Sequence, residues 1–147
     1  MLIRTAASWL LVLCFVLPLS YCSAKAGEKG RPAAAPITWS GLGIAQEALR
    51  DIGVTPAHEV PMLLNLGLVF FVPALCVRLG ALRHALIVGA SAIPAGLCLH
   101  VWVFVIGTPR YGGILAIACW IALTCASAVT LYTAAADRWR RHRSLAT

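Results

Sequence analysis

The chain has 147 residues, of which 61% are hydrophobic and only 12% charged, and its formal net charge is +7. Soluble domains contain roughly 25% charged residues, and a water-soluble fold of this size has nowhere to bury so much apolar surface. The basic residues lie mostly at the ends of apolar runs and are not interleaved with exposed aromatic residues, which argues against a nucleic-acid partner. The composition instead predicts an all-α integral membrane bundle of four transmembrane helices, formed by residues 1–147 as a single membrane domain in the lipid bilayer.

The first apolar run covers residues 5–22 and follows Arg4. It is either a retained first transmembrane helix, at the short end of the usual ~17–25 residues, or a secretory signal peptide. In the second case residues 1–26 are removed, because Ala24-Lys25-Ala26 forms a small-x-small cleavage site, and three transmembrane helices remain. Both alternatives place the following residues outside, since Arg4 holds the N-terminal end in the cytoplasm.

Residues 23–59 are predicted to form an outer loop that contains a short amphipathic helix at 41–53. Ser40 is suited to cap this helix and Gly53 to end it. We expect the helix to lie on the outer membrane surface or against the ends of the transmembrane helices. Its apolar residues recur at helical spacing: Leu42, Ala45, Ala48, Leu49 and Ile52.

Three further apolar runs, 60–77, 85–106 and 113–136, are predicted to span the membrane, and a basic cytoplasmic tail, 137–147, follows. The last run has 24 residues without a charge, enough to cross a hydrocarbon core of ~30 Å. Arginine is concentrated in short cytoplasmic flanks, and one topology fits Arg4, Arg78, Arg83, Arg138, Arg140, Arg141 and Arg143. The sequence therefore predicts a multi-pass protein of the plasma (inner) membrane with both termini in the cytoplasm.

Two runs of small residues are predicted to be helix-packing faces, because small side chains let neighbouring membrane helices approach closely. One run lies in the third span and the other in the fourth. They consist of Gly89, Ala92 and Gly96, and of Ala118, Ala122 and Ala126.

Few polar side chains occur inside the predicted spans, so each of them needs a partner or a role. Asn65, His100 and Cys119 are expected at a common depth, roughly 8–9 Å below the outer boundary. The mildest interpretation is an interhelical hydrogen bond between Asn65 and His100. The sharper one is a ligand, proton or metal site with His58 at its outer mouth.

We expect no catalytic residue and no cofactor. No carboxylate lies within a span, and no serine or cysteine has an identifiable base. The six cysteines include no C-x-x-C spacing, which argues against a structural metal site. A bis-histidine haem needs two facing imidazoles, and only His100 lies securely inside a span, so a haem or redox-metal protein is disfavoured.

Two segments, Phe15-Val16-Leu17-Pro18-Leu19-Ser20-Tyr21-Cys22 and Trp39-Ser40-Gly41-Leu42-Gly43-Ile44-Ala45, carry a resemblance to known proteins. With them the chain resembles small uncharacterised bacterial membrane proteins with four transmembrane helices. The resemblance implies that the first span is retained, and it implies no known activity.

Two functions are consistent with these features. The first is a non-enzymatic structural or assembly component that forms a homo-oligomer or joins a larger membrane complex, as the small-residue faces suggest. The alternative is a small transporter or channel subunit with a polar site in the outer leaflet, as Asn65 and His100 suggest.

Overall fold

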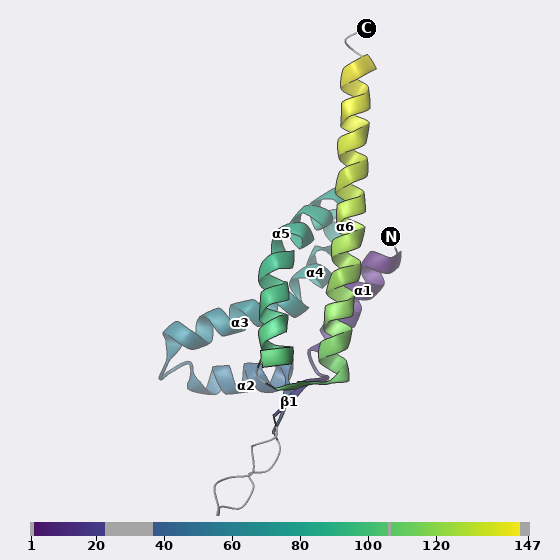
Figure 1. Ribbon diagram of the computed structural model, residues 1–147. Helices are drawn as coiled ribbons and strands as arrows, with labels where there is room; N and C mark the ends of the chain where they lie inside the picture. Colours follow the sequence, from purple (N-terminus) through teal and green to yellow (C-terminus); the bar gives the residue numbers. More distant parts are fainter. Residues whose placement is uncertain (1, 23–36, 106, 145–147) are drawn as a thin grey trace, which may run out of the picture.

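The computed structural model describes residues 2–22, 37–105 and 107–144, and most of them are helical (Figure 1). The first part contains helix α1 (Leu2–Cys14), strands β1 (Pro18–Cys22) and β2 (Ile37–Ser40), and helix α2 (Gly41–Asp51). Then follow α3 (Pro56–Phe70), α4 (Val72–Leu75) and the 3-10 turn η1 (Cys76–Leu79). The last part contains α5 (Ala81–His100), the π-helical turn η2 (Val101–Val105), strand β3 (Thr108–Pro109) and α6 (Tyr111–Ser144).

Two helices among the described residues are long and apolar enough to cross a membrane by themselves: α6, and α5 continued through η2. They coincide with the predicted spans 113–136 and 85–106, although α5 begins earlier, at Ala81. The predicted tail is not separate from the last span, because α6 continues without a break to Ser144. At about 1.5 Å per residue its 34 residues measure about 50 Å, and in Figure 1 α6 extends well past the other helices.

The predicted span at 60–77 differs from a continuous helix. The structure has α3, and then α4 with η1, and the two parts are bent by 51° relative to each other. The break at Phe71 lies just before Pro73, which has no backbone N–H and whose ring collides with the preceding helical turn. This pair gives a third crossing only if both parts are counted as one span.

The predicted first span at 5–22 is also different. Helix α1 ends at Cys14, and its 13 residues rise only about 20 Å, which is short of the ~30 Å hydrocarbon core. The chain then turns into β1 at Pro18. The described residues therefore contain two, or at most three, membrane-crossing helices rather than four. The predicted cleavage site at 24–26 lies outside the described residues.

A small antiparallel sheet, which the sequence does not predict, closes one end of the bundle. Its strand order is β2-β1-β3, so β1 pairs on both sides with segments distant in the chain. Tyr21 is the partner of Thr38 in β2 and of Thr108 in β3. We call this end of the molecule the sheet end, and the opposite end, where α6 carries its arginines, the tail end.

Glycines at the start of α6 allow the helix to lie directly against β1. A Cβ atom at Gly112 would lie 2.6 Å from the carbonyl oxygen of Pro18, and one at Gly113 would lie 2.5 Å from that of Leu19. Both distances are far below an ordinary contact, and the atoms met are backbone. Only glycine therefore fits where the sheet and α6 meet.

Helix α2 starts at the predicted position but shows a different buried face. The hydroxyl of Ser40 accepts a hydrogen bond of 3.0 Å from the backbone N–H of Gly43, the capping expected at a helix start. The helix ends at Asp51, before Gly53. Gly41, Ile44 and Ala48 are buried, whereas the predicted apolar residues Leu42 and Leu49 are exposed, the second by 60%.

The core joins all the long elements near the sheet end. Phe70 of α3 is fully buried, and its ring stacks on Trp102 of η2 with centroids 6.5 Å apart. Phe15, just after α1, packs its edge against Phe70 and Phe71. Leu11 of α1 and Leu123 of α6 complete this cluster.

Candidate functional site

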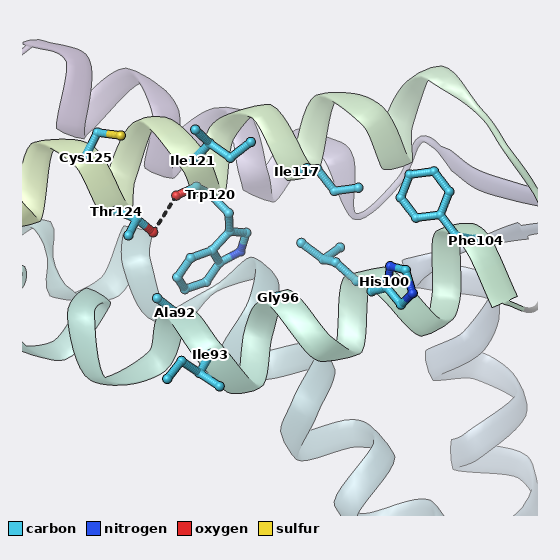
Figure 2. A pocket seen from close by; sticks show the side chains of 11 residues that line it. Ala92, Ile93, Gly96, His100, Phe104, Ile117, Trp120, Ile121, Thr124 and Cys125 are labelled. Atoms are coloured by element: carbon cyan, nitrogen blue, oxygen red, sulfur yellow. Dashed lines mark hydrogen bonds between the residues drawn. The ribbon is translucent and has the colours of Figure 1, made fainter.

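A groove of about 430 Å³ runs between α5 and α6, and we call it the α5–α6 groove (Figure 2). Its lining is almost entirely apolar. Figure 2 shows His100 and Phe104 at one end and Thr124 and Cys125 at the other. The lining residues are Ala92, Ile93, Gly96, Leu99, His100, Phe104, Ile117, Trp120, Ile121, Thr124 and Cys125.

The polar side chains of this groove differ in whether they have a hydrogen-bond partner. The hydroxyl of Thr124 donates a hydrogen bond of 2.8 Å to the carbonyl of Trp120, one turn earlier in the same helix. His100 is exposed, and its ring tilts against Phe104 with centroids 5.5 Å apart. No hydrogen bond joins the His100 ring to any described residue. Its imidazole is thus the open polar group of the groove.

The structure separates the predicted pair Asn65 and His100. Asn65 and His58 line a different pocket of about 340 Å³, together with Cys98 and Val101. Cys98 and Val101 face a different direction around the helix from Gly96 and His100, which line the α5–α6 groove. Helix α5 and η2 therefore lie between Asn65 and His100. Asn65 and His100 do not form the expected hydrogen bond.

Cys119, the third member of the predicted polar group, is buried in the hydrophobic core and lies in neither pocket. Within residues 2–22, 37–105 and 107–144, no three His, Cys, Asp or Glu side chains are grouped so that they could hold a metal ion.

The predicted small-residue faces of α5 and α6 do not pack against each other. Ala92 and Gly96 line the α5–α6 groove, and a Cβ atom at Gly96 would meet nothing within 4 Å. Ala122 and Ala126 line another pocket, against the start of α1. Gly89 and Ala118 are exposed. An added Cβ atom at Gly89 would lie 3.9 Å from a methyl group of Leu131 in α6, whereas Gly96 leaves open space in the groove.

Two side chains that were not predicted as site residues donate hydrogen bonds to backbone carbonyls at the break between α3 and α4. Pro73 cannot donate to the carbonyl of Val69, four residues earlier, and the indole Nε1 of Trp120 donates to that oxygen instead, at 3.0 Å. The ring of His84, itself fully buried, donates through Nε2 to the carbonyl of Pro73 at 3.1 Å. The carbonyls at the break are therefore occupied by protein donors rather than open to a ligand.

The predicted topology-setting arginines fall into two groups. Those near the ends of α5 and α6 are exposed: Arg78, Arg83, Arg138, Arg140, Arg141 and Arg143. Arg140 pairs with Asp137 at 3.0 Å, and Arg143 lies over the Trp139 ring. Arg4, by contrast, is only 7% exposed, and its Nε has no hydrogen-bond partner.

A smaller and more closed cavity, of about 170 Å³, lies at the sheet end. We call it the sheet-end cavity. Five elements contribute its walls, namely β1, β2, α2, α3 and η2, which explains why no local pattern in the sequence announces it. The lining residues are Ser20, Trp39, Ile44, Glu47, Met62 and Trp102.

No protein-family model, curated protein or solved structure matches the chain.

Proposed function

We propose that this chain is a non-enzymatic component of the plasma membrane that assembles with a second copy of itself through the α5–α6 groove. In this proposal both termini are cytoplasmic and the sheet end faces outward. The exposed arginines at the tail end support that orientation, because arginine is concentrated on the cytoplasmic side.

The observation that carries the proposal is His100, an exposed imidazole with no hydrogen bond in the described part of the chain. It lines the groove together with Ile117, which lies six residues, or roughly 9 Å, into α6. At that depth acyl chains offer no hydrogen-bonding group, and a polar side chain facing them is costly. A protein helix with an acceptor or donor satisfies the imidazole, and lipid does not.

Small residues make the groove accessible to such a helix. Gly96 lies on its floor with open space above it, and small side chains allow two helix backbones to come close. An exposed apolar stripe of α6 adjoins the groove, with Ile114, Ile121 and Val129 each more than half exposed. One copy therefore carries both a groove and an adjacent apolar face, and two copies related by a two-fold axis can bury both.

The test compares two substitutions on α5 that add the same side chain. Gly96→Leu fills the groove, whereas Ala90→Leu adds leucine at an exposed position outside it. We expect the native chain and Ala90→Leu to be dimers in lipid nanodiscs by mass measurement, and Gly96→Leu to be monomeric. A native chain that stays monomeric, or equal dimerisation of both variants, would overturn the proposal.

Cys125 supplies a second measurement that does not depend on a substitution in the groove floor. It is a free, exposed thiol that lines the groove. A short bifunctional maleimide should cross-link native chains in the membrane, and Cys125→Ser should abolish this product. A cross-linked dimer that persists in Cys125→Ser would place the interface elsewhere.

A further inference from the structure

We propose that the sheet-end cavity binds a small organic cation, an ammonium compound that also carries a hydroxyl group. Its volume of about 170 Å³ suits a compound of this size, since a cavity of ~150 Å³ accommodates benzene. Residues of β1, β2, α2, α3 and η2 line the cavity, and Figure 1 shows β1 and α2 at the sheet end. None of the residues that line the sheet-end cavity lines the α5–α6 groove.

Two tryptophans give the cavity walls that attract a positive charge. Trp39 comes from β2, and Trp102 comes from η2. Trp102 is only 8% exposed and is held by its stacking on Phe70. The face of an indole ring attracts an ammonium group more strongly than any other aromatic side chain, and more so away from water.

A carboxylate at the same cavity completes the attraction. Glu47 of α2 lines it. Glu59 of α3 does not line the cavity but lies one helical turn before the lining residue Met62 and is 7% exposed. One oxygen of Glu59 accepts a hydrogen bond of 3.3 Å from Thr55, and the other has no partner. The ion pair between Arg140 and Asp137 lies at the tail end. Neither Glu47 nor Glu59 is neutralised by a described cation.

The hydroxyl of Ser20 indicates what else the ligand carries. Ser20 is 1% exposed, lines the cavity, and has no hydrogen-bond partner. A buried polar group left without a partner costs about 1–3 kcal/mol, so native proteins rarely keep one. A ligand hydroxyl placed beside the ammonium group would satisfy Ser20, whereas an alkyl group in that place would not.

The experiment uses the full chain in nanodiscs and titrates it with choline, tetramethylammonium and the neutral carbon isostere of choline. We expect saturable quenching of tryptophan fluorescence by the two cations and none by the neutral compound. Glu47→Gln should weaken choline binding by roughly 10-fold or more, since 1.4 kcal/mol corresponds to a factor of about ten. Asp51→Asn, an exposed carboxylate on the same helix, serves as the matched control and should leave the affinity unchanged.

Ser20→Ala separates the role of the hydroxyl from that of the charge. It should weaken choline binding severalfold and leave tetramethylammonium binding unchanged. The proposal fails if neither cation binds saturably, if the neutral isostere binds as well as choline, or if Glu47→Gln binds as the native chain does. Glu47 is exposed on a helix surface, so its replacement by glutamine leaves the fold intact, and circular dichroism checks this.

Discussion

The break between α3 and α4 depends on a hydrogen bond that can be moved from a side chain to the backbone. Trp120 donates to the Val69 carbonyl because Pro73 cannot. Trp120→Phe removes the donor and leaves a buried carbonyl without a partner, which lowers the free energy of unfolding by about 1–3 kcal/mol. The smaller ring also loses packing contacts. Pro73→Ala restores a backbone N–H that reaches the same oxygen once the helix straightens. We therefore expect Trp120→Phe to destabilise the Pro73→Ala protein less than the native one.

The hydrogen bond from Trp120 to Val69 is 3.0 Å long and Trp120 is buried, so we expect the coupling free energy between the two substitutions to be that of an ordinary hydrogen bond between membrane helices. Hydrogen bonds between membrane helices contribute about 0.6 kcal/mol on average and up to about 1.7 kcal/mol. A coupling of about 1 kcal/mol corresponds to roughly 3 °C in the midpoint of thermal unfolding for a chain of this length.

Four proteins measured in one detergent by far-UV circular dichroism give the coupling directly: native, each single variant, and the double variant. The free-energy cost of losing the indole ring is the same in the native and the Pro73→Ala background, and the cost of losing the proline ring is the same with Trp120 and with Phe at position 120. Both costs therefore cancel in the double-mutant cycle. If Trp120→Phe lowers the thermal midpoint equally in the native and the Pro73→Ala background, the hydrogen bond to Val69 does not support the break.

Two further predictions concern the sheet end and the tail end. Gly113→Ala places a Cβ atom 2.5 Å from the Leu19 carbonyl oxygen and 2.7 Å from a Val103 methyl group, so we expect a loss of about 1–3 kcal/mol in stability. Gly67→Ala, where nothing lies within 4 Å, should be neutral or stabilising by up to about 1 kcal/mol, and equal thermal midpoints for the two variants would contradict the close approach of β1 to α6. A protease site added after residue 147 should be protected in intact cells and cleaved in inverted membrane vesicles, and cleavage from outside would reverse the proposed orientation.

The two long helices are predictable because a membrane-crossing segment is defined by its own length and polarity. Residues 113–136 contain no charge, and α6 includes all of them. The break at Phe71 is partly predictable, since Pro73 is visible in the sequence. Its angle of 51° is not, because the bend depends on which neighbours satisfy the freed carbonyls.

The predicted first span, 5–22, differs from the structure for another physical reason. Residues 15–22 are apolar enough to continue a helix, but Pro18 cannot donate within one, and the next residues pair with β2 and β3 instead. Those partners lie in distant parts of the chain, so hydropathy does not register them. Hydropathy also does not show that Asn65 and His100 are separated. Their expected depths agree, but they lie on different sides of α5 and η2.

The sequence by itself determined that the chain is mostly helical, that α5 with η2 and α6 can cross a membrane, and where positive charge gathers. Helix content, hydropathy and charge are sums over neighbouring residues of one segment, so they do not depend on contacts with other segments. The tertiary structure alone decided which donor meets the Val69 carbonyl, 51 positions from Trp120, and which six side chains enclose the sheet-end cavity. Contacts of that kind depend on the relative placement of several elements, and no local pattern of residues encodes that placement.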